Sequence, residues 1–166
     1  MPTEINVLIV YDSRTGNTEK MAFAVAEGAS EIKGANVTVK KADETKLKDL
    51  LEVDAIIVGS PTYYGQMSSK VKALFDRSVE IHGKLEGKVG AAFTSSGGTA
   101  AGAETTLLSI IQAMLIHGMI IQGKSREKHY GAATVGSPNE QELRICRELG
   151  KRTVQLAYKL KHEEEK

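Results

Sequence analysis

The sequence predicts an α/β domain over residues 1–166, a three-layer sandwich in which a five-stranded parallel sheet carries helices on both faces. Short apolar runs bounded by polar or glycine residues indicate buried strands. Longer stretches with apolar residues three and four positions apart indicate helices. The two kinds of segment alternate five times along the chain, which favours a parallel sheet with right-handed crossovers.

Five segments are expected to be strands. The runs 5–11, 55–59 and 89–93 are almost wholly apolar, as in strands that are buried on both faces. Residues 36–40 alternate between polar and apolar side chains, which is typical of an exposed or edge strand. Residues 119–122 form a short fifth candidate.

Four helical patterns accompany these strands. The first begins within residues 13–18, the second is centred on Val71 to Phe75, the third on 107–115, and the last runs from about Asn139 to Lys161. The longest stretch without a clear period is 123–138. We expect it to be an irregular loop, and a loop of that length in a compact domain is more often functional than idle.

Composition excludes several classes of protein. The chain has 22 Lys and Arg against 21 Asp and Glu, so a net charge of +1 gives no field that would attract nucleic acid. With 41% hydrophobic and 26% charged residues, most of the chain is expected to fold. No leader-like start and no apolar run of about 20 residues is present, which predicts a cytoplasmic protein that does not enter a membrane.

Cysteine and histidine usage argues against a metal centre. Cys146 is the single cysteine, so the chain can form no internal disulfide and no cysteine-based zinc site, and its apolar neighbours predict a core side chain. His82, His129 and His162 fall too far apart in the expected fold to form a cluster. We therefore expect no metal.

Ligands of such sheets bind beyond the carboxyl ends of the strands, so the loops there carry the functional signal. The loop after the first strand consists of Ser13, Arg14, Thr15, Gly16, Asn17 and Thr18. Hydroxyl groups and free backbone N–H groups at a helix N-terminus make an anion site, and a phosphate group fits there. The same residue types also serve as an ordinary helix cap. A nucleoside triphosphate is disfavoured because the loop lacks a Gly-Lys-Ser/Thr ending.

The loop after the third strand combines turn residues with aromatic ones: Pro61, Thr62, Tyr63, Tyr64 and Gly65. Pro61 fixes a turn, and Gly65 lets the backbone approach a ligand closely. A flat ring could stack on the adjacent tyrosines, although a pair of hydrated surface tyrosines is the simpler reading.

The loop after the fourth strand is made of small residues: Ser95, Ser96, Gly97, Gly98, Thr99 and Ala100. They would offer backbone donors and acceptors to a polar, flat molecule. A flexible turn between a strand and a helix has the same composition. Tyr130 is expected at the same edge of the sheet.

Taken together, these loops resemble a known family. Residues 13–18 are similar to the phosphate loop of flavodoxins, with its hydroxyl-x-Thr-Gly-x-Thr pattern. A resemblance to the WrbA-type NAD(P)H:quinone oxidoreductases extends over residues 59–67, 93–98, 104–106, 117–119, 130–133 and 138–152. The resemblance covers nearly the whole chain and implies the flavodoxin-like fold, with sheet order 2-1-3-4-5, and FMN as cofactor.

The resemblance also implies a role for each loop. Residues 13–18 would hold the FMN phosphate, Pro61 and residues 62–65 would flank the isoalloxazine ring, and residues 95–100 would run along the ring and the ribityl chain. His117 stands where the family has a histidine that borders the flavin pocket, often reached from a neighbouring subunit of a tetramer. The other reading of His117 is a cap at a helix end.

The implied activity is transfer of two electrons from NADH or NADPH, through FMN, to a quinone or similar flat acceptor. His117 or a tyrosine could supply a proton. The chain is shorter than the longer family members, has no tryptophan, and is abbreviated at 79–83. The resemblance therefore does not imply an aromatic wall on which the substrate stacks. It also leaves open whether a homo-oligomer would be a dimer or a tetramer.

Two other readings remain. A flavodoxin that carries single electrons, without a substrate of its own, would have the same fold, although such carriers often dock through a strongly acidic face and this chain has a net charge of +1. A phosphoacceptor receiver domain would want an acidic residue at the end of the third strand, where Gly59 and Ser60 stand.

Overall fold

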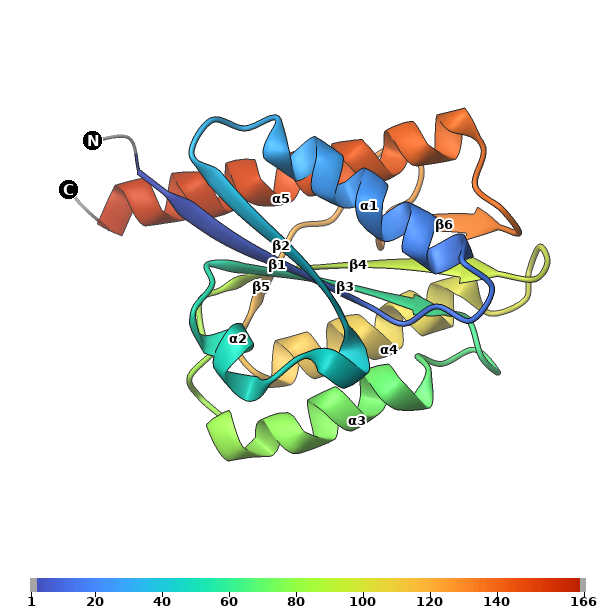
Figure 1. Cartoon of the computed structure of the whole chain (residues 1–166), viewed down its shortest axis with the longest axis horizontal. Coiled ribbons are helices and arrows are strands. Elements are labelled where there is room, and N and C mark those ends of the chain that lie inside the picture. The colour runs from blue at the N-terminus through green and yellow to red at the C-terminus, as the bar shows by residue number, and fades with distance from the viewer. Residues whose placement is uncertain (1–2, 165–166) are drawn as a thin grey trace.

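Parallel strands form one sheet at the centre of the molecule, in the order β2-β1-β3-β4-β5, with β6 paired to β4 (Figure 1). The computed structural model describes residues 3–164. The strands are β1 (Ile5–Tyr11), β2 (Ala35–Lys41), β3 (Ala55–Pro61), β4 (Val89–Ser96), β5 (Ile120–Ile121) and β6 (Ala132–Val135). The helices are α1 (Asn17–Ser30), α2 (Leu47–Leu51), α3 (Ser69–Arg77), α4 (Ala103–Ile116) and α5 (Glu140–Glu164), with 3₁₀ turns at Ala42–Glu44 and Ser78–Ile81.

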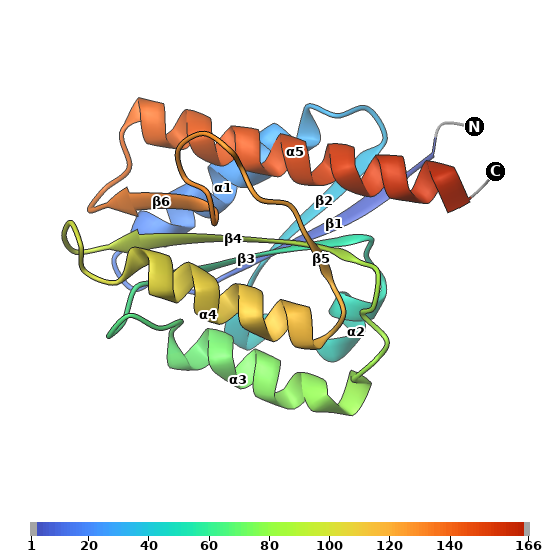
Figure 2. The same cartoon turned by 180° about the vertical axis from the view of Figure 1, so that it is seen from behind.

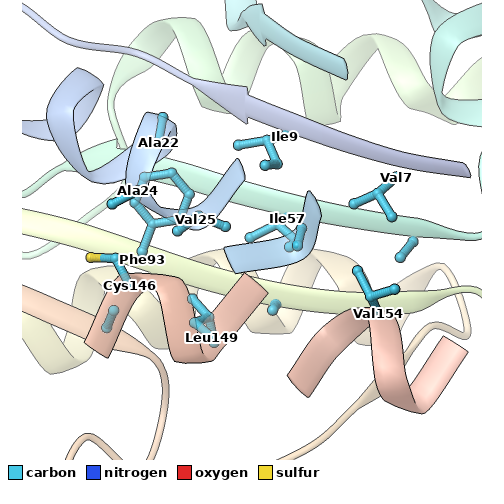
Figure 3. Packing of buried hydrophobic residues seen from close by; sticks show 14 of the residues in the cluster. Val7, Ile9, Ala22, Ala24, Val25, Ile57, Phe93, Cys146, Leu149 and Val154 are labelled. Carbon is cyan, nitrogen blue, oxygen red and sulfur yellow. The ribbon is translucent and has the colours of Figure 1, made fainter. Parts of the chain in front are cut away.

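Two hydrophobic cores lie on opposite faces of the sheet. Alternate residues of β1 divide between them: Val7 and Ile9 pack under α1 and α5, whereas Leu8 and Val10 face α3 and α4. Figure 3 shows the first of these cores, with Phe93 of β4 beside the α1 residues. Because both faces are covered, the central strands are apolar over most of their length, which is the pattern that the sequence shows.

Helices α1 and α5 lie side by side on one face and touch through glycines (Figure 2). A Cβ atom on Gly28 would lie 1.9 Å from the carbonyl oxygen of Arg147, and one on Gly150 would lie 2.0 Å from that of Val25. Their missing side chains let the two backbones approach closely. This contact fixes α1, and with it the loop that precedes α1.

The expected fold class and strand order are confirmed, and β1 has the predicted bounds. β3 and β4 run further than expected, to Pro61 and Ser96. The sequence analysis assigned the polar residues at these two strand ends to loops. In the structure they are buried strand residues, because hydroxyl groups such as those of Thr94 and Ser96 bond to the main-chain carbonyls of Ser60 and Thr134.

The prediction of an irregular loop over 123–138 is wrong in part. Ala132–Val135 forms β6, which pairs in parallel with Phe93–Ser96 of β4. β5 is only two residues long and pairs with the start of β4. The edge position is thus shared by two short strands, neither long enough to give a clear pattern, and residues 122–131 connect them.

The carboxyl ends of β1, β3 and β4 open toward the same edge of the sheet. In Figure 1 their loops gather on the right, beside the start of α1, while α3 and α4 end on the left. Between residues 3 and 164, no helix is both long and apolar enough to cross a membrane.

Candidate cofactor site

The loop after β1 ends in an uncapped helix start. Gly16 occupies the cap position with φ of 92°, and in the described part of the chain no side chain caps the helix. The first hydrogen bond of the turn runs from the N–H of Lys20 to the carbonyl of Gly16, at 3.0 Å. The N–H groups of residues 17–19 precede that bond and have no acceptor within the helix. A Cβ atom on Gly16 would meet nothing within 4 Å, so space is open beside these donors.

The side chains of this loop differ in how accessible they are to a ligand. Ser13 accepts a hydrogen bond from the N–H of Gly16 at 3.1 Å, which shapes the turn. Arg14 and Thr15 are exposed and Asn17 is half-buried. Thr18 is buried, and its hydroxyl lies 2.8 Å from Oγ of Ser95, so Thr18 ties the helix to β4.

Two charged side chains at the start of α1 are held by neutral hydrogen-bond partners. Tyr11, at the end of β1, donates a 2.6 Å hydrogen bond to Glu19, the acidic residue in the first turn of α1. Burial, and then this bond, raise the pKa of Tyr11 to about 12, so the phenol keeps its proton and holds the carboxylate. Lys20 reaches Oγ of Ser137, which follows β6, at 3.1 Å.

The loop after β3 is a tight turn that presents aromatic rings. Tyr63 and Gln66 exchange main-chain hydrogen bonds of 3.1 and 3.0 Å. Between them, Tyr64 and Gly65 have φ of 51° and 72°, the left-handed pair of a type I′ turn. Tyr64 is fully exposed and Tyr63 is 40% exposed. A non-glycine residue held in this conformation at a loop tip is a candidate for ligand contact.

The loop after β4 touches this turn. A Cβ atom on Gly102 would lie 2.7 Å from Cα of Gly65, so the two loops meet backbone to backbone. Ser96 donates to the carbonyl of Gly98 at 2.9 Å and thereby bends the chain away from β4. Ala100 has a left-handed φ of 53°. The remaining residues of the loop, Gly97 and Thr99 among them, are exposed or half-buried.

Pro61 and Ser95 differ from their expected surroundings. They are paired residues at the ends of β3 and β4, and both are buried. The structure therefore brings the three loops to one edge, but Pro61, Ser95 and Ser96 lie in the strands that support them.

Sequence reading missed the hydroxyl residues that hold the turn after β3. Ser60 accepts a hydrogen bond from the N–H of Ser68 at 2.8 Å, and Ser109 of α4 accepts one from the N–H of Met67 at 3.1 Å. Thr94 bonds both Ser60 and Thr62. The available signal was the run of hydroxyl residues at the ends of two otherwise apolar strands.

His117 lies elsewhere in the chain. It follows the last turn of α4, whereas the loop after β4 leads into the first turn, so the 14-residue helix separates them by about 20 Å. Its Nε2 atom lies 2.6 Å from Oγ of Ser78, and Nδ1 is buried with no hydrogen-bond partner among residues 3–164. Burial, with a smaller effect of nearby His82, lowers the pKa of His117. Within one chain, His117 does not join the predicted loops.

The expected position of Tyr130 is wrong. β6 begins at Ala132, opposite Phe93, so Tyr130 precedes this strand and lies short of its carboxyl end. It lines a hollow of about 250 Å³ beside Glu104 and Lys128. Sequence reading placed Tyr130 at the edge because it overlooked β6.

Comparison with known proteins agrees with this geometry. The family model described as flavodoxin matches residues 9–111. A flavodoxin of Aquifex aeolicus is 42% identical over 154 residues, which cover 88% of this chain and 83% of the relative. An NAD(P)H dehydrogenase (quinone) of Archaeoglobus fulgidus is 40% identical over 188 residues, covering 93% and 98%.

A solved structure gives the same result. The flavodoxin, WrbA-like protein of Agrobacterium tumefaciens superposes with a TM-score of 0.80 at 29% identity, and the match covers 94% of this chain and 99% of that one. The matched family model spans the end of β1 and its loop, the turn after β3 and the loop after β4, which are the segments that build the site. The chain belongs to the flavodoxin family.

Proposed function

We propose that the chain is an FMN-dependent oxidoreductase that transfers two electrons from NADH or NADPH to a quinone-like acceptor. The observation that carries the proposal is the free helix start at residues 17–19, beside the open space at Gly16 and on the same edge as the exposed turn of Tyr63 and Tyr64. Relatives that match 93–94% of this chain are named NAD(P)H dehydrogenase (quinone).

FMN is the cofactor that the family implies, and the residues present fit it. Its phosphate needs several donors in an open cradle, which the N–H groups of residues 17–19 supply together with the helix dipole. Thr15 and Arg14 are exposed beside them. The Tyr11 phenol restrains the one acidic side chain in this turn, Glu19.

The ring would lie against the two loops that meet at Gly65 and Gly102. Residues 62–65 would flank one side of it, and residues 95–100 would run along the ring and the ribityl chain. When bound, FMN supplies the hydride and electron chemistry. The chain binds and orients the cofactor, and its exposed tyrosines give a flat substrate a surface on which to stack. No side chain is required as a nucleophile.

Assembly and location complete the proposal. The surface near His117 exposes Val79, Leu115 and Ile116, by 71%, 55% and 74%. We propose that a second copy covers this apolar surface in a dimer or tetramer, which is the arrangement in which the resemblance implies a flavin role for His117. Light scattering of the purified protein tests it. We also propose that the reaction takes place in the cytoplasm, where NADH and NADPH are available as donors.

A one-electron carrier is the second candidate, and one observation favours it. The alignment with the Aquifex aeolicus flavodoxin spans 154 positions, whereas that with the quinone dehydrogenase of Archaeoglobus fulgidus spans 188, more than the 166 residues of this chain. The quinone dehydrogenase therefore has segments that this chain lacks. The net charge of +1 argues against the acidic docking face of many carriers.

Spectroscopy with turnover separates the two. The proposal expects a yellow protein whose blue absorption is bleached by NADH or NADPH and restored by a quinone, with steady turnover when both are present. Thr62→Ala and Tyr64→Ala should lower turnover. A yellow protein that dithionite reduces but nicotinamides do not would support the carrier, and a colourless protein that takes up no FMN would exclude both.

A further inference from the structure

Three residues at the ends of β3 and β4 form a hydrogen-bonded chain of fixed direction. Oγ1 of Thr94 lies 2.6 Å from the main-chain carbonyl oxygen of Ser60 and 2.8 Å from Oγ1 of Thr62. A carbonyl oxygen has no proton, so Thr94 donates its only hydroxyl proton to Ser60. Thr62 must then donate its own proton to Thr94.

Burial keeps this direction from reversing. Thr94 is fully buried, and no water can take over the carbonyl of Ser60 without an energetic cost. The N–H of Thr62 also bonds the carbonyl of Ser95 at 2.8 Å, so main chain and side chain of Thr62 are both tied to β4. Thr62 is half-buried, so its oxygen keeps a lone pair for a ligand but has no proton left to give.

We propose that Thr94 is a positioning residue that makes Thr62 an obligate hydrogen-bond acceptor, and that Thr62 thereby recognises an N–H group of the flavin ring. The inference rests on the proposed FMN site. The isoalloxazine edge presents carbonyl oxygens, the N3–H group in both redox states, and an N5–H group only after reduction. A fixed acceptor selects the N–H groups and disfavours the carbonyl oxygens.

Replacing Thr94 by valine keeps the shape of the side chain and removes its hydroxyl. Thr62 then regains a free proton, and its orientation toward the flavin is lost. We expect Thr94→Val to weaken FMN binding five- to tenfold in at least one redox state, the usual value of one hydrogen bond. Thr94→Ser keeps the hydroxyl and should bind FMN like the wild type. Fluorescence titration gives the affinity of oxidised FMN.

The reduction potential shows which N–H group is recognised. If Thr62 accepts from N3–H, both redox states weaken equally and the potential stays unchanged. If it accepts from N5–H, only the reduced state weakens, and a tenfold loss lowers the potential by about 30 mV for a two-electron couple. Either result supports the role of Thr94.

A double variant separates positioning from general damage. Thr62→Val removes the acceptor itself and leaves the bond from Thr94 to Ser60 intact, so it should cost the same five- to tenfold. In that background, Thr94→Val should change the affinity by less than twofold, because Thr94 acts through Thr62. Thermal unfolding of each variant confirms that it is folded.

Several outcomes would overturn the inference. They are unchanged affinity in both redox states for Thr94→Val, equal loss for Thr94→Ser, or a full additional loss in the Thr62→Val background. If Thr94→Val does not fold, Thr62→Val decides alone, and its unchanged affinity in both states would refute the role. Wild-type protein that takes up no FMN would overturn the proposed function too, whereas normal uptake with indifferent variants overturns only this inference.

Discussion

Thr15 is exposed and directly precedes Gly16, where space is open, so a charge introduced at this position should decide whether the loop accepts a phosphate. Thr15→Glu places a carboxylate beside the dianion. At about 4 Å the repulsion is roughly 1 kcal/mol in water and about 4 kcal/mol near a protein surface. We therefore expect at least a tenfold loss of FMN affinity in a titration.

The matched control is Thr15→Gln, which has the size of glutamate without its charge. It should keep most of the affinity, and raising the salt concentration should partly restore binding to Thr15→Glu only. Equal losses in both variants would mean that volume rather than charge governs this position.

His117 predicts how stability depends on pH. Its pKa is lowered in the folded state by burial, so below about pH 6.5 the unfolded chain binds a proton more readily than the folded one. Stability is therefore highest above that pH and falls as the pH drops toward the folded-state pKa. The slope from one such group reaches at most about 1.4 kcal/mol per pH unit.

His117→Gln should flatten this slope between pH 7 and 5 in urea unfolding experiments. It should also be less stable than the wild type at pH 7, because the bond between the imidazole and Ser78 is lost. Exposed His162→Gln serves as the control and should leave the slope unchanged. An unaltered slope in His117→Gln would show that other groups cause the acid sensitivity.

At the level of elements, the contact between α1 and α5 depends on Gly150. Alanine favours a helix by about 1 kcal/mol over glycine. Here its Cβ would lie 2.0 Å from the main-chain oxygen of Val25, which cannot move away without displacing α1. Overpacking of this kind costs about 1–3 kcal/mol, so the clash should outweigh the propensity. We expect Gly150→Ala to lower the free energy of unfolding in urea.

Gly97→Ala is the control, because a Cβ there meets nothing within 4 Å. It should change the free energy of unfolding by less than about 0.5 kcal/mol. A stabilised Gly150→Ala would show that the two helices can separate without cost.

Elements were predictable where one physical signal dominates. β1 is buried on both faces, and its apolar run Ile5–Tyr11 marks its ends directly. β6 has no such run, because Ala132–Val135 contains small and polar residues and owes its position to pairing with β4. Long-range pairing leaves no trace in local composition. The misplacement of Tyr130 follows from that one omission.

The candidate site likewise combines local features, which the sequence predicts, with long-range contacts, which it does not. The loop at residues 13–18 could be predicted, because a helix start with free donors is a local feature. The link from Thr94 to Ser60 and Thr62 could not, since it joins residues more than 30 positions apart. His117 also needed the structure, because only the direction of α4 shows that the residue lies at the far end.

At the level of the whole molecule, the proposed cofactor would join loops from three strands of one sheet. Anything that binds only the folded state stabilises it by mass action, by about 2.7 kcal/mol at a hundredfold excess over Kd. For a chain of this size, 1 kcal/mol raises Tm by about 2–4 °C, so saturating FMN should raise Tm by about 5–10 °C. Riboflavin has the same ring without the phosphate and should give a clearly smaller shift. Scanning calorimetry at matched ligand concentrations measures both, and an equal shift for the two ligands would show that the free helix start at residues 17–19 does not hold the phosphate.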